Sequence, residues 1–219
     1  MKKKTVAYLC VVAVALISFA VWTALVRLVD VQAIGPQSSS VGFASLNGAF
    51  HRLTGVHLSL YTLTDWLSLL PLGAVLCFAA LGLTQWIGRK HLLRVDPDLL
   101  ALGVFYAVVM AVYLLFECVV INYRPVMLSG SLEVSYPSST TMLVLCVMPT
   151  VIAQLNRRVK HVALRRWATW GICFFTVFMV LGRILSGVHW ITDIIGGILI
   201  STCLVSAYLA ACELLDHPS

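Results

Sequence analysis

The chain has 219 residues, of which 60% are hydrophobic and only 11% are charged. A water-soluble domain of this length needs about a quarter charged residues to cover its surface, so this composition excludes one and indicates a protein embedded in lipid. The net charge of +6 does not call for a nucleic acid, because most basic residues lie between hydrophobic stretches, where membrane topology accounts for them.

The first predicted element is a membrane-spanning helix over about residues 5–26, preceded by three lysines. A cleaved signal peptide has a shorter apolar core with a small-residue cleavage site close behind it. This run is long enough to cross about 30 Å of hydrocarbon and predicts a membrane anchor. Residues 35–40 form a loop rich in Gly, Pro and Ser. Residues 43–60, in which apolar positions mix with His51, Arg52 and His57, predict a helix lying at the interface.

Five further spans follow along the chain, with polar or basic loops between them. The hydrophobic stretches predict spans at about residues 65–87, 98–121, 138–154, 167–186 and 190–214. No internal repeat and no separate soluble domain is visible in the sequence. The predicted fold is therefore an all-α integral membrane bundle of six transmembrane helices, in which residues 1–219 form a single domain.

The placement of lysine and arginine predicts the orientation of this bundle in the plasma membrane. With the amino terminus inside, 11 of the 15 basic residues fall in cytoplasmic segments and four fall outside. Both termini should then be cytoplasmic, and the connections at residues 122–136 and 187–189 should face outside. The inner residues are Lys2, Lys3, Lys4, Arg89, Lys90, Arg94, Arg157, Arg158, Lys160, Arg165 and Arg166; the outer ones are Arg27, Arg52, Arg124 and Arg183.

Four polar residues near the outer end form the most informative pattern of the sequence. His189 and Asp193 are four residues apart, so on a helix both side chains point to one face. Arg183 precedes them, and Arg124 begins the preceding outer loop. Ionisable groups within a membrane are expensive, so their grouping at one depth favours a function over a structural role. His189 can attack phosphorus, with Asp193 orienting the imidazole and stabilising its positive form.

The start of the fourth predicted span adds an anion site to these residues. Pro137 stands directly before Ser138 and Ser139. Proline at a first helical turn leaves free backbone N–H groups pointing outward, which attract anions. Together with two guanidinium groups and the serine hydroxyls, this helix terminus would hold a phosphoryl group.

Three motifs in this region resemble the signatures of the type 2 phosphatidic acid phosphatase (PAP2) superfamily. The pattern Gly-Arg-x5-His-x3-Asp at residues 182–193 resembles the third signature, Ser-Arg-x5-His-x3-Asp. Tyr-Arg-Pro at 123–125 resembles the end of the first, Lys-x6-Arg-Pro, and Tyr-Pro-Ser-Ser-Thr-Thr at 136–141 stands where the second has Pro-Ser-Gly-His. The resemblance covers about residues 117–197 and extends to the six-helix layout. It implies a metal-independent lipid phosphatase or phosphotransferase that works through a phosphohistidine on His189, and the predicted orientation places this activity at the outer leaflet.

Two departures from the family signatures bear on catalysis. Thr140 stands where the second signature has its histidine, the general acid that protonates the leaving group, and the loss of such an acid costs about 10²–10⁴ in rate. Glu117 stands where the first signature has its lysine. Either Glu117 supplies the missing proton, or it packs against Arg124 or caps a helix. Ser138, Ser139, Thr140 and Glu117 are the predicted substrate-binding residues.

Three functions remain compatible with the sequence. The first is an enzyme that removes or transfers phosphate from a membrane lipid, and the second is a weakened relative that binds a phospholipid or lipid carrier without turnover. The third is a small transporter, although no span has a Gly/Pro-broken centre with polar groups at the midplane. If the protein is an enzyme, the missing acid favours a lipid pyrophosphate such as a polyprenyl pyrophosphate, whose leaving group departs without a proton.

The sequence does not predict a cofactor or a metal site. A metal bound by His189 and Asp193 would need additional ligands, and the nearby arginines would repel a cation. The seven cysteines lie in apolar runs without CxxC or Cys/His spacing, so we expect buried, reduced thiols. His51, His57 and Asp65 lie on the outer side, where they either approach the phosphate site or serve as interfacial residues.

Overall fold

A computed structural model describes residues 3–215, and Lys2 of the charge count lies outside the described residues. Two isolated β-bridges, Gln32–Val41 and Tyr123–Val134, hold the loops at one end of the molecule. Within residues 3–215 the elements are α1 (Lys3–Leu28), η1 (Pro36–Ser38), α2 (Ala44–Thr54), α3 (Leu58–Leu67), α4 (Leu69–Arg89), η2 (Leu92–Arg94), α5 (Pro97–Cys118), α6 (Ser139–Arg158), α7 (Val162–Leu185) and α8 (Ile191–Leu215).

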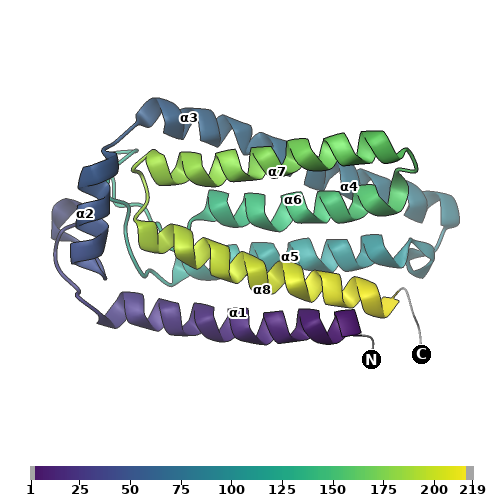
Figure 1. Cartoon of the computed structure of the whole chain (residues 1–219), viewed down its shortest axis with the longest axis horizontal. Helices are drawn as coiled ribbons and strands as arrows, with labels where there is room; N and C mark the ends of the chain where they lie inside the picture. The colour runs from purple at the N-terminus through teal and green to yellow at the C-terminus, as the bar shows by residue number, and fades with distance from the viewer. Residues whose placement is uncertain (1–2, 216–219) are drawn as a thin grey trace.

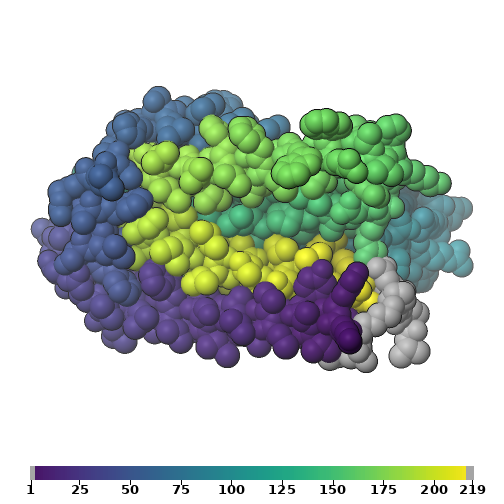
Figure 2. Space-filling view, in the orientation of Figure 1, coloured from purple at the N-terminus to yellow at the C-terminus, as the bar shows by residue number. Residues whose placement is uncertain are grey.

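Six helical spans run side by side along the long axis of the molecule (Figure 1). Each is long and apolar enough to cross a membrane: α1, the continuous α3–α4 stretch, α5, α6, α7 and α8. About half of α6 and α8 is buried inside the protein, whereas the other spans are mostly exposed on its surface. The prediction of an all-helical six-span bundle is confirmed, with α6 and α8 as its centre. In Figure 2, α8 is visible between α1 and α7.

The predicted boundary of the second span is wrong. The interfacial helix ends at Thr54 instead of continuing to residue 60, and the chain re-enters the bundle at Leu58, seven residues before the predicted start. Asp65 interrupts the apolar pattern and displaced the prediction. In the structure this carboxylate faces Arg183, so a charged residue lies inside the span. The remaining interfacial helix, α2, crosses one end of the bundle (Figure 1).

The prediction that all seven cysteines are buried is also wrong. Cys146, Cys203 and Cys212 are buried in the protein, and within residues 3–215 none of the seven cysteines forms a disulfide. The other four lie on the outer surfaces of the spans, where an apolar side chain meets lipid instead of protein: Cys10, Cys77, Cys118 and Cys173.

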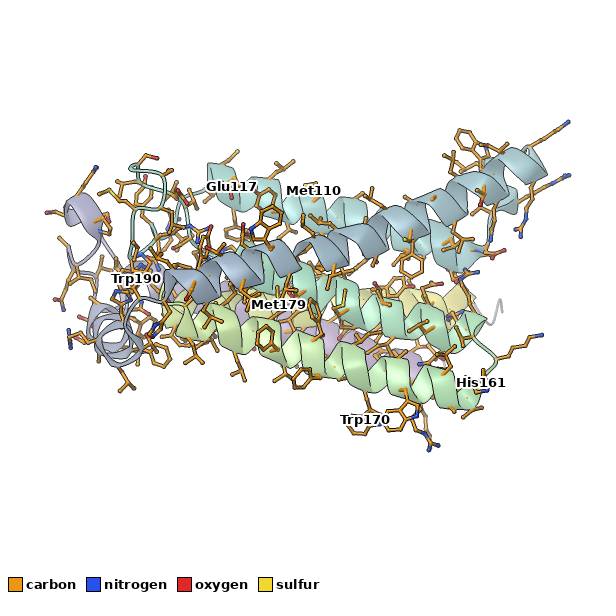
Figure 3. The ribbon with its side chains drawn as sticks, turned by 90° about the horizontal axis from the view of Figure 1, so that it is seen from above. Met110, Glu117, His161, Trp170, Met179 and Trp190 are labelled. Atoms are coloured by element: carbon orange, nitrogen blue, oxygen red, sulfur yellow. The ribbon has the colours of Figure 1, made fainter. Side chains whose placement is uncertain are left out.

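The two ends of the bundle differ in composition. One end carries the start of α1, the α4–α5 connection and the α6–α7 connection with His161 (Figure 3). We call it the basic end, since it holds Arg89, Lys90 and Arg158. The opposite end, marked by Trp190 in Figure 3, carries α2, residues 119–138 and the α7–α8 turn. We call it the site end, because His189 lies there.

Candidate active site

His189 lies in the turn between α7 and α8 and is 5% exposed. Its Nε2 is 3.1 Å from Nη1 of Arg124, and its Nδ1 is 3.8 Å from Oδ2 of Asp193. Asp193 is fully buried and accepts hydrogen bonds from the backbone N–H of Trp190 (3.0 Å) and the amide of Asn122 (3.2 Å). The carboxylate is thereby fixed on one side of the imidazole, while the other ring nitrogen faces a guanidinium group.

The electrostatic setting keeps this imidazole neutral. Burial lowers the pKa of His189 from its ordinary value near 6.5 to about 4. The nearby carboxylate of Asp193 raises this pKa, but the charges of Arg124 and Arg183 oppose it. Near neutral pH, a neutral ring with its proton on Nδ1 towards Asp193 leaves a lone pair on Nε2, which is what a nucleophile requires.

Arg183 is 2% exposed and joins three helices. Its Nη2 donates to the hydroxyl of Thr140 and lies 3.4 Å from Oδ1 of Asp65. Its Nη1 donates to the hydroxyl of Thr64 at 3.4 Å, and the guanidinium carbon stands 4.8 Å from the centre of the Tyr61 ring. Nε has no partner. A buried guanidinium with a free donor beside a histidine is suited to bind an anionic oxygen.

Arg124 connects the imidazole to the loop of residues 119–138. Its Nε forms an ion pair with Glu133 at 3.1 Å, and its backbone N–H donates to the carbonyl of the same residue. Glu117 is exposed on α5 (Figure 3) and interacts with Tyr113 one helical turn earlier. Within residues 3–215, no ion pair or hydrogen bond joins Glu117 to Arg124, and the carboxylate paired with this arginine is Glu133.

The amino terminus of α6 supplies polar groups on the other side of the site. The helix begins at Ser139, and the N–H of Ser138 donates to the backbone carbonyl of Asp193 at 3.0 Å. The amide of Ser138 is therefore occupied, and the free amides at the helix start are those of the first helical turn, residues 139–141. The hydroxyls of Ser138 and Thr141 are buried without a partner. These groups form a cradle of donors next to His189 and Arg183.

Two glycines of α8 allow this cradle to approach Asp193. A Cβ at Gly196 would lie 2.6 Å from the ring of Tyr136, and one at Gly197 would lie 3.3 Å from the carbonyl of Ser138. Any larger side chain would push α6 away from α8. The pair therefore holds the start of α6 against the helix that carries the aspartate.

A second set of close contacts fixes α3 to the α7–α8 turn. Gly187 has φ +68°, a conformation that suits glycine, and a Cβ there would lie 1.9 Å from the carbonyl oxygen of Gly55. The N–H of His57 donates to the carbonyl of Ser186 at 3.0 Å. A Cβ at Gly182 would lie 2.6 Å from Thr64. These contacts place one face of α3 directly beside Arg183.

An apolar groove leads from the site along the bundle. A cavity of about 340 Å³ between α4, α5 and α6 has Ser68, Ser139 and Thr140 at one end and otherwise mainly apolar side chains. A second cavity of about 400 Å³ continues between α4 and α5 towards the basic end, and Val75 and Tyr106 line both. This mainly apolar groove begins beside the donor cradle, at Ser139 and Thr140.

The sequence left open whether His51, His57 and Asp65 approach the phosphate site, and the structure answers this differently for each residue. Asp65 contacts Arg183 and lies at the site. His57 bonds the backbone carbonyl of Thr54 at 2.9 Å, and His51 packs against the ring of Trp190 with 5.5 Å between ring centres. Sequence reasoning missed Asn122 and Glu133, which hold Asp193 and Arg124. Within residues 3–215, no group of three His, Cys, Asp or Glu side chains is arranged to hold a metal ion.

Comparisons with known proteins agree with this geometry at the level of family and fold. The family model described as the PAP2 superfamily matches residues 72–213. The chain therefore belongs to the PAP2 superfamily, and it is a multi-pass membrane protein of that family. No curated protein matches the sequence.

One solved structure similar to this chain is the crystal structure of the first transmembrane PAP2 type phosphatidylglycerolphosphate phosphatase from Bacillus subtilis. It superposes with a TM-score of 0.65 and 17% sequence identity, over 92% of this chain and 96% of that chain. At this identity the likeness establishes a shared fold.

Proposed function

We propose that this protein is a membrane lipid phosphatase or phosphotransferase that transfers a phosphoryl group from a lipid phosphate or pyrophosphate to His189. The observation that carries the proposal is the buried imidazole held between a guanidinium group and a carboxylate. Its Nε2 stands 3.1 Å from Arg124, and its Nδ1 faces a buried carboxylate. A merely structural histidine would have both ring nitrogens satisfied by fixed partners, whereas Nδ1 has no hydrogen-bond partner here.

The first chemical step follows from the surrounding groups. Nε2 of His189 attacks phosphorus, the P–O bond to the lipid breaks, and the electron pair leaves with the lipid oxygen. The guanidinium groups of Arg124 and Arg183, together with the free N–H groups of residues 139–141, stabilise the charge on the equatorial oxygens. Asp193 stabilises the positive charge that develops on the ring.

The lipid class is supported by the groove between α4, α5 and α6. A phosphoryl group in the donor cradle places the attached chain at Ser139 and Thr140, where the groove of about 340 Å³ begins. Its mainly apolar lining fits a hydrocarbon chain and would not favour a sugar or a nucleoside.

The leaving group points to a pyrophosphate. Thr140 cannot protonate an alkoxide near neutral pH, and its hydroxyl oxygen accepts a hydrogen bond from Arg183. A phosphate monoester, by contrast, departs from a lipid pyrophosphate without a proton. We therefore infer that a polyprenyl-type pyrophosphate is cleaved faster than a phosphatidic acid.

The test is phosphate release by the detergent-solubilised protein from a panel of lipid phosphates and pyrophosphates. We expect release from at least one pyrophosphate and its loss in His189→Ala, with the variant still folded by thermal unfolding. Turnover that survives in His189→Ala would exclude the covalent mechanism.

A lipid-binding protein without turnover is the second candidate, and the threonine at position 140 is the observation that favours it. Tight binding of a lipid pyrophosphate by the wild-type chain, without release of phosphate from any member of the panel, would select this candidate over the enzyme.

We further propose that the site end faces outside the cell and that both termini are cytoplasmic, because the basic residues gather at the opposite end. Single cysteines at the exposed positions Ser129, Ser131, Lys90 and Lys160, in a chain without its native cysteines, test this in intact cells. An impermeant thiol reagent should label the first two. Labelling at Lys90 or Lys160 instead would reverse the orientation and move the site to the cytoplasmic face.

A further inference from the structure

Asp65 is the only carboxylate among residues 3–215 that contacts Arg183. Its Oδ1 lies 3.4 Å from Nη2, and its side chain is 55% exposed. It lies near the site end of the long α3–α4 span, only seven residues after the span begins at Leu58. A charged residue at this depth is costly unless it has a role at the site.

The other carboxylates near His189 are less accessible to water than Asp65. Asp193 is fully buried, and each of its oxygens accepts a hydrogen bond, from Asn122 and from the backbone of Trp190. Glu133 pairs with Arg124. Asp65 is the more exposed of the two carboxylates that pair with a site arginine, with a side chain 55% exposed compared with 31% for Glu133.

Asp65 and Thr140, whose hydroxyl cannot serve as a general acid or base near neutral pH, contact the same arginine. The same nitrogen, Nη2 of Arg183, contacts the Asp65 carboxylate and the Thr140 hydroxyl. Thr140 borders the groove proposed for the lipid, and so does Ser68, three residues after Asp65 on the same stretch of helix. Once the lipid product leaves by this groove, the carboxylate is at the edge of the space that water would fill.

The position of Asp65 is fixed by the backbone. Gly182 lets α3 approach α7 closely at Thr64, the residue directly before the aspartate. Ser68 donates its backbone N–H to the carbonyls of Thr64 and Asp65, both at 3.1 Å, so the helix continues past the aspartate. A group held in place in this way can act as a general base.

We propose that Asp65 is the general base for the second half of the reaction, which rests on the proposed phosphohistidine at His189. A water molecule attacks phosphorus on the side opposite Nε2, and Asp65 accepts one proton of this water. The O–P bond forms, the N–P bond breaks, and its electron pair returns to Nε2 of His189. The products are inorganic phosphate, a neutral histidine and a protonated Asp65, which releases its proton to solvent.

This assignment separates the two half-reactions, and Asp65→Asn tests it. The variant keeps the shape of the side chain and a group that can contact Arg183, but it cannot accept a proton from water. The probe is a polyprenyl pyrophosphate labelled with ³²P at its terminal phosphate, mixed with excess protein and quenched in alkali, which preserves phosphohistidine. We expect lipid product to form at nearly the wild-type rate, while labelled protein accumulates and steady-state turnover falls by about 10²–10⁴.

Three further proteins make the result decisive. Asp30→Asn is the matched control, because Asp30 is an exposed carboxylate at the same end that contacts Gln32 and Ser45. It should turn over like the wild type. Asp65→Glu retains a base and should show an intermediate rate, and Asp65→Asn/His189→Ala should take up no label.

Each alternative outcome is distinct. Equal slowing of both half-reactions in Asp65→Asn would show that the carboxylate only positions Arg183 and would overturn the general-base role. Normal turnover in Asp65→Asn would overturn any role. Absence of label on His189 in a wild-type protein that hydrolyses the substrate would overturn the proposed covalent mechanism itself, and this role with it.

Discussion

The two ends of the bundle both gather arginines and carboxylates, but they use them in opposite ways. At the basic end Arg89 lies 2.9 Å from Asp96, and Arg158 bridges Asp96 at 3.2 Å and Asp98 at 2.8 Å. Gln85 and Arg89 hydrogen-bond Asp96 and help to lower its pKa to about 2. Every charge in this cluster has a partner, and the cluster ties α4, α5 and α6 together.

At the site end the polar groups are more deeply buried and less completely paired. Arg183 and His189 are 2% and 5% exposed, compared with 28% for the side chain of Arg158. The site end nevertheless has several buried atoms without hydrogen-bond partners: Ser138 Oγ, Thr141 Oγ1, Arg183 Nε and His189 Nδ1. Each such atom costs roughly 1–3 kcal/mol. A satisfied cluster stabilises the fold, and an unsatisfied one at the same kind of position indicates a site built for an anionic ligand.

The same substitution at the two ends should separate these roles most strongly. Arg183→Gln should lower kcat/KM by about 10²–10³, the usual cost of losing one transition-state donor, with a small change in melting temperature. Arg158→Gln should leave turnover near wild type but lower the unfolding free energy by about 1–3 kcal/mol, since Asp98 loses its cation. Phosphate release and thermal unfolding in detergent measure both. The reverse pattern would mean that the site-end cluster is structural.

A phosphate-like ligand should supply the partners that the site end lacks. Orthovanadate adopts the five-coordinate geometry of the transferring phosphoryl group. At a concentration 100 times its Kd it should stabilise the wild-type protein by about 2.7 kcal/mol. Arg158→Gln should show the same increment and Arg183→Gln a smaller one, as read from the shift in melting temperature. No shift in the wild type would argue against an anion site.

The fold could be predicted from the sequence because the length of an apolar stretch is enough to predict a membrane-spanning helix. The predicted start of the second span was wrong, because Asp65 interrupts the apolar pattern. In the structure this aspartate lies inside the span and is compensated by Arg183, 118 residues away. Such a partner is invisible to a local pattern. The spacing of His189 and Asp193 predicted that the two side chains meet, and the structure places them 3.8 Å apart.

Other parts of the site depend on packing between distant segments and could not be predicted. Asn122 reaches Asp193 across 71 residues. The choice of Glu133 rather than Glu117 as the partner of Arg124 depends on how residues 119–138 fold back, held by the bridge between Tyr123 and Val134. No local sequence pattern predicts how this loop folds back.

The lowered pKa of His189 gives a test that needs no substrate. Its pKa is near 6.5 in the unfolded chain and about 4 in the fold, so the unfolded chain binds more protons between these values. Stability should therefore fall as pH falls from 6.5 to 4, by about 1.4 kcal/mol per pH unit for one proton. His189→Gln should remove this contribution, while the contribution of His51, whose pKa is also lowered by burial, remains in both proteins. Asp96 at the basic end does not interfere, because its own stabilisation is lost only towards pH 2. An equal slope in both proteins would mean that His189 is not buried neutral.

The smallest expected effect concerns the leaving group. Thr140→His places a proton donor where Arg183 now contacts the Thr140 hydroxyl. Thr140 is only 7% exposed, so the larger ring would have to fit beside the guanidinium group in a buried position. Because the site is not adapted to this ring, we expect a gain of only about tenfold, below the usual range for a general acid. The gain should appear with phosphatidic acid, whose alkoxide needs a proton, and not with a lipid pyrophosphate, whose phosphate leaves unprotonated. Steady-state kinetics of both substrates with both proteins measure the difference. Efficient turnover of phosphatidic acid by the wild type, unchanged in the variant, would show that another group, such as Glu117, already supplies the proton, and the preference for pyrophosphates would then be wrong.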